Sequence, residues 1–268
     1  MLERLLNFVG TLYKNRYMIR SFAKADLKKR YADSYGGVAW AVIQPLMMIL
    51  TYYVIFSYVF KRKVQADYGT DSYALWLISG LLPWFFFSES VRRSSGALLE
   101  NRALVTKTLF PSEIIPVCLI VSGLVNHIIG LGILFVFSVV ISGGISVYSG
   151  FVVIYFLLMA VMILGLNWAL SSLNAFIRDI SQGVTIIMNL WFYYTPIIYP
   201  AGIVPEKYRW ILEINPMYYI VEGYRDSLVA GRLPDPYKLL YLAVFSVSVF
   251  ALGGLLYKRL KPAFIDVL

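Results

Sequence analysis

The chain has 268 residues, of which 59% are hydrophobic and only 15% are charged. A soluble domain is usually about 45–50% apolar and about 25% charged, so this composition, with a mean hydropathy of +0.70, excludes water as the main solvent of the protein. The net charge of +9 fits basic flanks that face anionic lipid better than it fits nucleic-acid binding. The single cysteine, Cys118, excludes an intramolecular disulfide.

Residues 1–37 predict a helix on the cytoplasmic surface of a membrane. The first ten residues hold Glu3 and Arg4 and no unbroken apolar run, so we do not expect a signal peptide. Over residues 2–20 the apolar side chains repeat with a helical period, which predicts an amphipathic helix in the interface. The basic residues that follow are Lys24, Lys28, Lys29 and Arg30. They either anchor the cytoplasmic side of the membrane or bind the phosphate of a lipid head group, and the sequence leaves both interpretations open.

Six segments predict helices that cross a bilayer, which requires about 20 apolar residues each. One uncharged run, residues 114–177, is too long for a single span, and Ser142-Gly143-Gly144 divides it into two. The predicted spans cover residues 38–60, 72–91, 114–141, 147–173, 181–199 and 238–257. We therefore expect an all-α integral membrane protein with six transmembrane helices, forming one domain over residues 1–268.

An even number of spans places both termini on the same side of the membrane. The segments on that side are 1–37, 92–113, 174–183 and 258–268, and they hold 16 of the 24 lysines and arginines. Because cytoplasmic loops are enriched in these residues, we predict that both termini lie in the cytoplasm.

Two connections on the predicted cytoplasmic side combine charges with apolar or aromatic side chains. The candidate residues are Asn101, Arg102, Lys107, Phe176, Arg178 and Asp179. Short helices of this composition suit docking to a soluble partner. The same composition also suits a solvated loop, and spacing alone does not decide between the two.

Residues 200–231 predict broken helices on the outer side of the membrane. Pro196 and Pro200 end the preceding span. One short helix follows up to Ile214, and a second begins at Asn215-Pro216, where Asn is an N-cap and Pro occupies the first turn. The residues singled out in this region are Pro196, Pro200, Asn215, Pro216, Glu222 and Arg225. Broken helices at membrane depth are tolerated where they are buried in protein or line a watery cavity.

Aromatic side chains make up 16% of the chain, and some fall in or near the predicted spans. The candidates are Tyr52, Tyr53, Phe56, Trp191, Tyr194 and Tyr199. Their flat faces and hydroxyl groups suit a channel for sugars, and helix packing is the alternative. His127, the single histidine, has no carboxylate in its span, which favours a neutral packing role over a functional one.

Several chemical motifs are absent from the sequence. It contains no phosphate-binding loop, no His-Glu-x-x-His motif and no paired cysteines. We therefore expect no bound metal or cofactor, no catalytic residue and no ATP hydrolysis in this chain.

The order and spacing of these motifs resemble the permease subunits of type-2 ABC exporters, in the branch that exports O-antigen, capsule and teichoic acid polysaccharides. The resemblance covers nearly the whole chain and rests on Lys29-Arg30-Tyr31, Ser34, Gly37, Trp40, Gln44-Pro45, Gly80-Leu81-Leu82-Pro83-Trp84, Asn101, Lys107, Phe110-Pro111, Arg178-Asp179, Thr195-Pro196-Ile197-Ile198-Tyr199-Pro200, Asn215-Pro216 and Arg225.

The resemblance implies a homodimeric permease in the bacterial cytoplasmic (inner) membrane that exports a lipid-linked glycan. It also implies two copies of a separate nucleotide-binding ATPase subunit, which binds the ATP and Mg. Residues 92–110 and 174–181 would be coupling helices that contact this subunit, and residues 200–231 would be re-entrant helices that gate the exit.

Two other functions remain as alternatives. One is a permease for a small lipophilic drug or lipid. The other, from a different class, is a membrane-embedded polyprenyl-phosphate transferase, which would require clustered carboxylates at the cytoplasmic membrane edge. Glu89, Glu100, Glu113 and Asp179 are scattered along the sequence.

Overall fold

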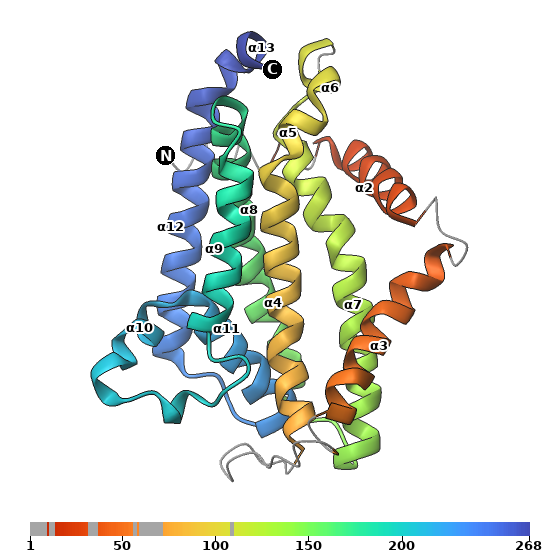
Figure 1. Ribbon diagram of the computed structural model, residues 1–268, viewed down its shortest axis with the longest axis vertical. Coiled ribbons are helices and arrows are strands. Elements are labelled where there is room, and N and C mark those ends of the chain that lie inside the picture. The colour runs from red at the N-terminus through yellow and green to blue at the C-terminus, as the bar shows by residue number, and fades with distance from the viewer. Residues whose placement is uncertain (1–9, 11–13, 32–36, 56–57, 59–71, 108–109) are drawn as a thin grey trace.

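A computed structural model of the chain describes residues 10, 14–31, 37–55, 58, 72–107 and 110–268. Over these residues the protein is all-α, as predicted, with no strand (Figure 1). The α-helices are α2 (Arg16–Tyr31), α3 (Trp40–Val54), α4 (Tyr73–Ser95), α5 (Ala97–Glu100), α6 (Arg102–Lys107), α7 (Ile114–Ser142), α8 (Val152–Phe176), α9 (Ile180–Tyr194), α10 (Arg209–Ile214), α11 (Pro216–Arg225), α12 (Pro236–Leu260) and α13 (Phe264–Val267). Short 3-10 or π-helical turns join them: η1 (Gly37–Ala39), η4 (Val147–Phe151), η5 (Ala201–Ile203), η6 (Glu206–Tyr208), η7 (Asp226–Ala230) and η8 (Lys261–Ala263).

Four helical segments of the described chain are long and apolar enough to cross a membrane. They are Tyr73–Ser95, Ile114–Ile141, Val147–Phe176 and Pro236–Val267, and they lie where the sequence predicted the second, third, fourth and sixth spans. The helices in the first and fifth predicted spans, α3 and α9, have 15 residues each. At 1.5 Å per residue their described parts are roughly 22 Å long, less than the roughly 30 Å of a bilayer core. The count of six spans therefore stays a prediction.

The bundle has two ends of different construction (Figure 1). α5, α6 and α13 lie at one end, which we call the α13 end, and α10 and α11 lie at the other, the α10–α11 end. Most of the predicted amphipathic stretch, residues 2–20, lies outside the described residues. Its continuation is helical in α2, which packs against α7 near the α13 end.

Helix α4 forms the centre of the main core. It packs against α7, α8, α9 and α11, and its side chains from Tyr73 to Phe87 are almost all buried. Ser72 caps its first turn by accepting a hydrogen bond from the Leu75 amide. Helix α4 is therefore enclosed by other helices along most of its length.

Helices α8 and α12 approach most closely where both lack side chains. A methyl group added at Gly165 of α8 would overlap the backbone of Val249 and Phe250 of α12, and one added at Gly253 would overlap Gly165. Small residues allow such close approach between membrane helices. These two glycines therefore set the distance between α8 and α12.

Helix ends occur where the sequence predicted them. Gly143 adopts a left-handed conformation (φ +74°) at the end of α7, which confirms the break in the long apolar run. Asn215 caps α11 with Pro216 in the first turn, and Gly231 (φ +63°) follows the π-helical turn η7 after α11. These helix ends are therefore determined by one or two local residues.

Candidate functional site

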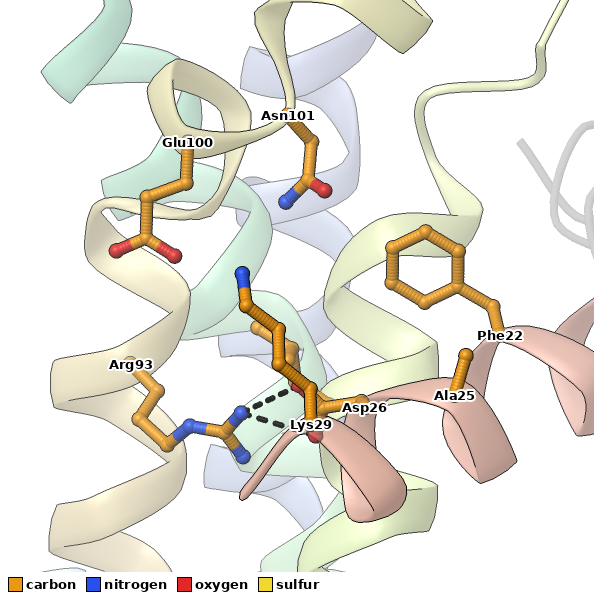
Figure 2. Close-up of a pocket in the computed structure, with 8 residues that line it drawn as sticks. Phe22, Ala25, Asp26, Lys29, Arg93, Glu100 and Asn101 are labelled. Atoms are coloured by element: carbon orange, nitrogen blue, oxygen red, sulfur yellow. Dashed lines mark hydrogen bonds and ion pairs between the residues drawn. The ribbon is translucent and has the colours of Figure 1, made fainter. Parts of the chain in front are cut away.

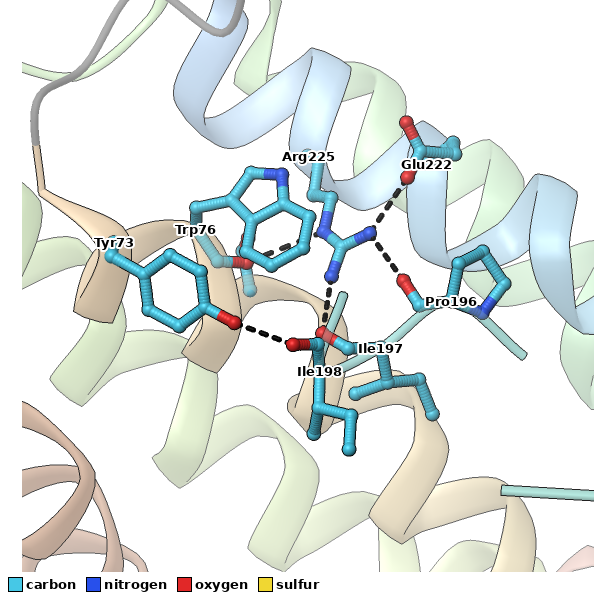
Figure 3. Close-up of polar contacts among 8 residues, drawn as sticks. Tyr73, Trp76, Pro196, Ile197, Ile198, Glu222 and Arg225 are labelled. Carbon is cyan, nitrogen blue, oxygen red and sulfur yellow. Dashed lines mark hydrogen bonds and ion pairs between the residues drawn. The ribbon is translucent and has the colours of Figure 1, made fainter. Parts of the chain in front are cut away.

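Arg225 of α11 is the centre of a buried polar cluster at the α10–α11 end (Figure 3). Its side chain is 0% exposed, and its guanidinium donates to the Glu222 carboxylate at 2.7 Å and to the carbonyls of Pro196 at 2.8 Å and Ile197 at 2.7 Å. A longer hydrogen bond, 3.3 Å, reaches the carbonyl of Trp76 in α4. A buried charge is tolerated when a carboxylate and several oxygens surround it in this way.

The same guanidinium stacks on α4. Its central carbon lies 3.6 Å from the ring centroid of Trp76, a cation–π contact. Gly80, one turn further along α4, leaves the space for it, since a methyl group there would lie 2.8 Å from Arg225 Nη2. Tyr73 of α4 donates its hydroxyl to the carbonyl of Ile198. The connection after α9 is therefore fixed to the first turns of α4.

Asn215 forms a second polar centre beside the first. Its side-chain oxygen accepts hydrogen bonds from the Met217 amide at 3.0 Å and from Trp191 Nε1 at 2.9 Å. Its amide nitrogen donates to the Thr195 hydroxyl at 2.9 Å. Asn215 therefore joins the end of α9 to the start of α11, a role beyond the N-cap that the sequence predicted.

The residues predicted for an outer gate are thus distributed over neighbouring contacts. Pro196, Glu222 and Arg225 meet in one cluster, while Asn215 and Pro216 begin the helix that carries two of them. Pro200 precedes the turn η5. The sequence could not predict which backbone carbonyls accept hydrogen bonds from Arg225, because every residue has a backbone carbonyl.

The aromatic channel candidates occupy different environments. Trp191 is half-buried, with its ring edge-to-face on Phe87 at 5.2 Å, and Tyr53 packs edge-to-face on Phe137 at 5.0 Å. These are the contacts of helix packing. Tyr194 is 58% exposed.

Two further channel candidates, Tyr199 and Tyr52, lie within the described residues. Tyr199 donates its hydroxyl to the carbonyl of Tyr193, and Tyr52 is half-buried. Phe56 lies outside the described residues.

His127 lies in a buried aromatic environment. Its Nε2 is 2.9 Å from the Tyr224 hydroxyl, and its ring packs against Phe86 and Phe156 with centroids 5.0 and 5.3 Å apart. These contacts are those of a packing histidine, which was the favoured interpretation.

Two ion pairs fasten α2 to α4 near the α13 end. Arg93 donates from one nitrogen to both oxygens of Asp26, at 2.7 and 2.9 Å, and Arg30 pairs with Glu89 at 2.8 Å. Burial raises the pKa of the Asp26 carboxyl, but hydrogen bonds from Arg93 and Ser122 and the positive charges of Arg93 and Arg30 outweigh it and hold the pKa below the ordinary value of 3.8. Arg30 is therefore engaged in fixing α2.

The other three residues of the predicted head-group patch, Lys24, Lys28 and Lys29, are exposed on α2. Lys29 also borders a cavity of about 200 Å³ between α2, α4 and α5, where its side chain points toward Glu100 and Asn101 (Figure 2). The cavity is lined by Phe22, Ala25, Asp26, Lys29, Arg93, Glu100, Asn101 and Leu119. Its charged lining is balanced between two cations and two carboxylates, so its charge alone does not favour a phosphate.

The predicted docking residues lie at the α13 end. Arg102, Arg178 and Asp179 are exposed, Phe176 is 40% exposed, and Asn101 donates to the carbonyl of Ala97 at 2.8 Å. The Lys107 side chain lies outside the described part of the chain. Helix α13 packs against α6 at this end, a contact that no feature of the sequence indicates.

The carboxylates that a transferase would need lie in separate contacts. Glu89 pairs with Arg30, and Glu113 pairs with Lys261 at 2.6 Å. Among the described residues, no group of three or more His, Cys, Asp or Glu side chains is arranged to hold a metal ion.

Four helices of the described chain are long and apolar enough to cross a bilayer, which is the pattern of a multi-pass α-helical membrane protein. Residues 17–229 match the model of the family described as ABC-2 type transporter, and the chain belongs to this family. This family consists of transport subunits and not of enzymes, so the chain is a transport protein.

Relatives align along nearly the entire chain. The chain is 26% identical over 264 residues to the O-antigen export system permease protein RfbA of Myxococcus xanthus, covering 98% of this chain and 99% of the relative. It is 30% identical over 246 residues to an RfbA of Klebsiella pneumoniae, covering 91% and 92%. It is 23% identical over 241 residues to the polysialic acid transport protein KpsM of Escherichia coli, covering 89% and 91%.

Proposed function

We propose that this chain is the membrane subunit of an ATP-driven exporter that moves lipid-linked polysaccharide, of the O-antigen, capsule or teichoic acid type, across the bacterial cytoplasmic membrane. The observation that carries the proposal is the match to O-antigen and polysialic acid transport proteins over about nine tenths or more of the chain. Two such relatives act on different glycans, so the shared property is export of a long polar polymer.

The chain works as a homodimer with two copies of a separate nucleotide-binding subunit, which binds ATP and Mg. No phosphate-binding loop occurs in the sequence, and membership of the ABC-2 type transporter family supports an external ATPase. The polymer passes between the two permeases.

Both termini lie in the cytoplasm, with six spans and with residues 200–231 re-entrant from the outside. In this arrangement the α13 end is cytoplasmic, which agrees with the exposed Lys258, Arg259 and Arg178 at that end. Helices α3 and α9 complete the six spans, since short spans are accommodated by local thinning of the bilayer or by oligomerisation.

The two ends have separate tasks in this proposal. Segments 92–110 and 174–181 receive the movement of the ATPase, because Arg102, Phe176, Arg178 and Asp179 remain exposed there. Residues 200–231 form the exit gate, and Arg225 fixes this gate to α4. The patch at Lys24, Lys28 and Lys29 faces the anionic head groups of the inner leaflet, where the lipid carrier enters.

The experiment that tests the function is purification of the permease with its ATPase, followed by assay of hydrolysis with defined glycans. A lipid-linked polysaccharide should stimulate hydrolysis, whereas a lipophilic drug or simple lipid should not. Stimulation by the drug class alone would reject polysaccharide export. Glycosyl or phosphoryl transfer by the permease purified alone would favour the transferase alternative.

A further inference from the structure

The C-terminal helix α13 follows directly from the last long helix and is fixed to the bundle. Phe264, its first residue, is 1% exposed and packs edge-to-face on Tyr257 with centroids 5.3 Å apart. Tyr257 in turn donates its hydroxyl to Ser112 at 2.8 Å, and Lys261 pairs with Glu113. α13 is therefore held in a defined place by buried contacts.

Those contacts belong to an apolar cluster separate from the main core. The cluster contains Ala97 and Leu98 of α5, Ala175 at the end of α8, and Tyr257 and Phe264. The ring of Phe176 lies 6.3 Å from that of Phe264. Both predicted coupling segments and α13 therefore pack on the same apolar cluster, so they form one connected surface and not separate loops.

Apolar side chains next to this cluster are exposed. Ile265 of α13 is 70% exposed, Ile177 is 54% exposed, and Phe176 is 40% exposed. Helix α13, which carries Ile265, packs against α6 and α8 at the α13 end (Figure 1). Adjacent exposed apolar side chains are typical of a surface that a partner covers.

The charged residues exposed at this end are more often basic than acidic. They are Arg102, Arg178, Lys258, Arg259 and Lys261, the last paired with Glu113, against Glu100, Asp179 and Asp266. A partner surface with an apolar depression and acidic residues around it would complement this arrangement.

We propose that α13 is a third element of the surface that binds the nucleotide-binding subunit, with Ile265 inserted into that subunit beside Ile177 and Arg178. This inference rests on the proposed function and adds a segment to its docking surface. The occupant is the ATPase because the surface is continuous with both coupling segments through the shared apolar cluster.

The test uses the complete transporter and a photo-reactive amino acid at single positions. Placed at position 265 or at position 178, it should form an adduct with the nucleotide-binding subunit. Placed at position 203, where Ile203 is 61% exposed at the opposite end, it should form none. An adduct at 178 without one at 265 would overturn the role of α13 and leave the proposed function standing; no adduct at either position would reject the docking surface itself.

A substitution gives the second measurement. Ile265→Asp should reduce the amount of permease recovered with a tagged ATPase by about tenfold or more, because tenfold corresponds to only about 1.4 kcal/mol and a buried charge costs more. Ile203→Asp is the matched control and should leave recovery unchanged. Both variants should reach the membrane in normal amounts, since both side chains are exposed. Normal recovery of Ile265→Asp would contradict the proposal.

Discussion

The two ends of the molecule differ in how they use their polar and apolar groups. At the α10–α11 end, the Arg225 guanidinium is completely buried and bonded within the chain. At the α13 end, Arg178 and Ile265 are exposed. The polar cluster around Arg225 is bonded within the chain and is suited to move as one body, whereas exposed side chains such as Arg178 and Ile265 are suited to bind another protein. The predictions that follow test this contrast and are ordered by their expected effect on the free energy of unfolding.

Replacing Arg225 should have the largest effect. Arg225→Met removes the partner of Glu222 and of three backbone carbonyls, and breaking a buried pair costs about 3–5 kcal/mol. We expect a large drop in the melting temperature of the purified transporter and loss of export. Arg209→Met is the control at the same end, because its pair with Glu206 is 3.7 Å long and exposed and is worth at most about 1 kcal/mol. Equal melting temperatures for the two variants would show that the buried cluster has no special role.

A side chain at Gly165 should have the next effect. Gly165→Leu places atoms where α12 has its backbone, and overpacking of this kind costs about 1–3 kcal/mol. The measurement is the melting temperature in detergent. Gly132→Leu, at a position in α7 with no neighbouring atom within 4 Å, should melt like the unsubstituted protein. If both variants melt alike, α8 and α12 are not as close as described.

The ion pair that fastens α2 should have a smaller effect that depends on pH. Because the folded-state pKa of Asp26 is lower than its ordinary value of 3.8, its contribution to stability is complete above that pH and is lost as the pH falls through the lower, folded-state pKa. Asp26→Asn should therefore lower stability at neutral pH by about 1 kcal/mol, as partly exposed pairs do. The difference between variant and parent, followed by thermal melting, should shrink in acid. A difference that stays constant down to the lowest accessible pH would contradict the ion pair.

Reversing the charge at Arg178 should have no effect on stability. Arg178→Glu changes an exposed residue at the proposed docking surface, so we expect normal melting but ATP hydrolysis that no longer drives export. Lys238→Glu makes the same reversal at the start of α12, outside residues 200–231, and should transport normally. Unchanged export by Arg178→Glu would show that this residue does not couple the two subunits.

Features set by nearby residues could be predicted from the sequence. The end at Gly143 and the cap at Asn215 depend on the chemistry of one or two residues. The apolar runs predicted four of the long helices for the same reason, since a bilayer imposes length and composition on each segment.

Contacts between distant residues could not be predicted. Asp26 and Arg93 are 67 residues apart, and Arg225 bonds to carbonyls of Trp76, Pro196 and Ile197. A backbone carbonyl has no residue-specific signature, and two opposite charges far apart in the sequence have many equivalent partners. The aromatic residues Trp191 and Tyr53 show the same limit, because a ring suited to sugars is equally suited to pack on Phe87 or Phe137.

The sidedness of the two ends is the central claim, and a single labelling experiment tests it. Cysteines are placed one at a time at Arg178 and at Trp210, both exposed, in a chain whose own Cys118 is buried. A membrane-impermeant thiol reagent added to right-side-out vesicles should label position 210 at once and position 178 only after the vesicles are opened. Labelling of position 178 in sealed vesicles would place the docking surface outside, where no ATPase can reach it, and would contradict the account.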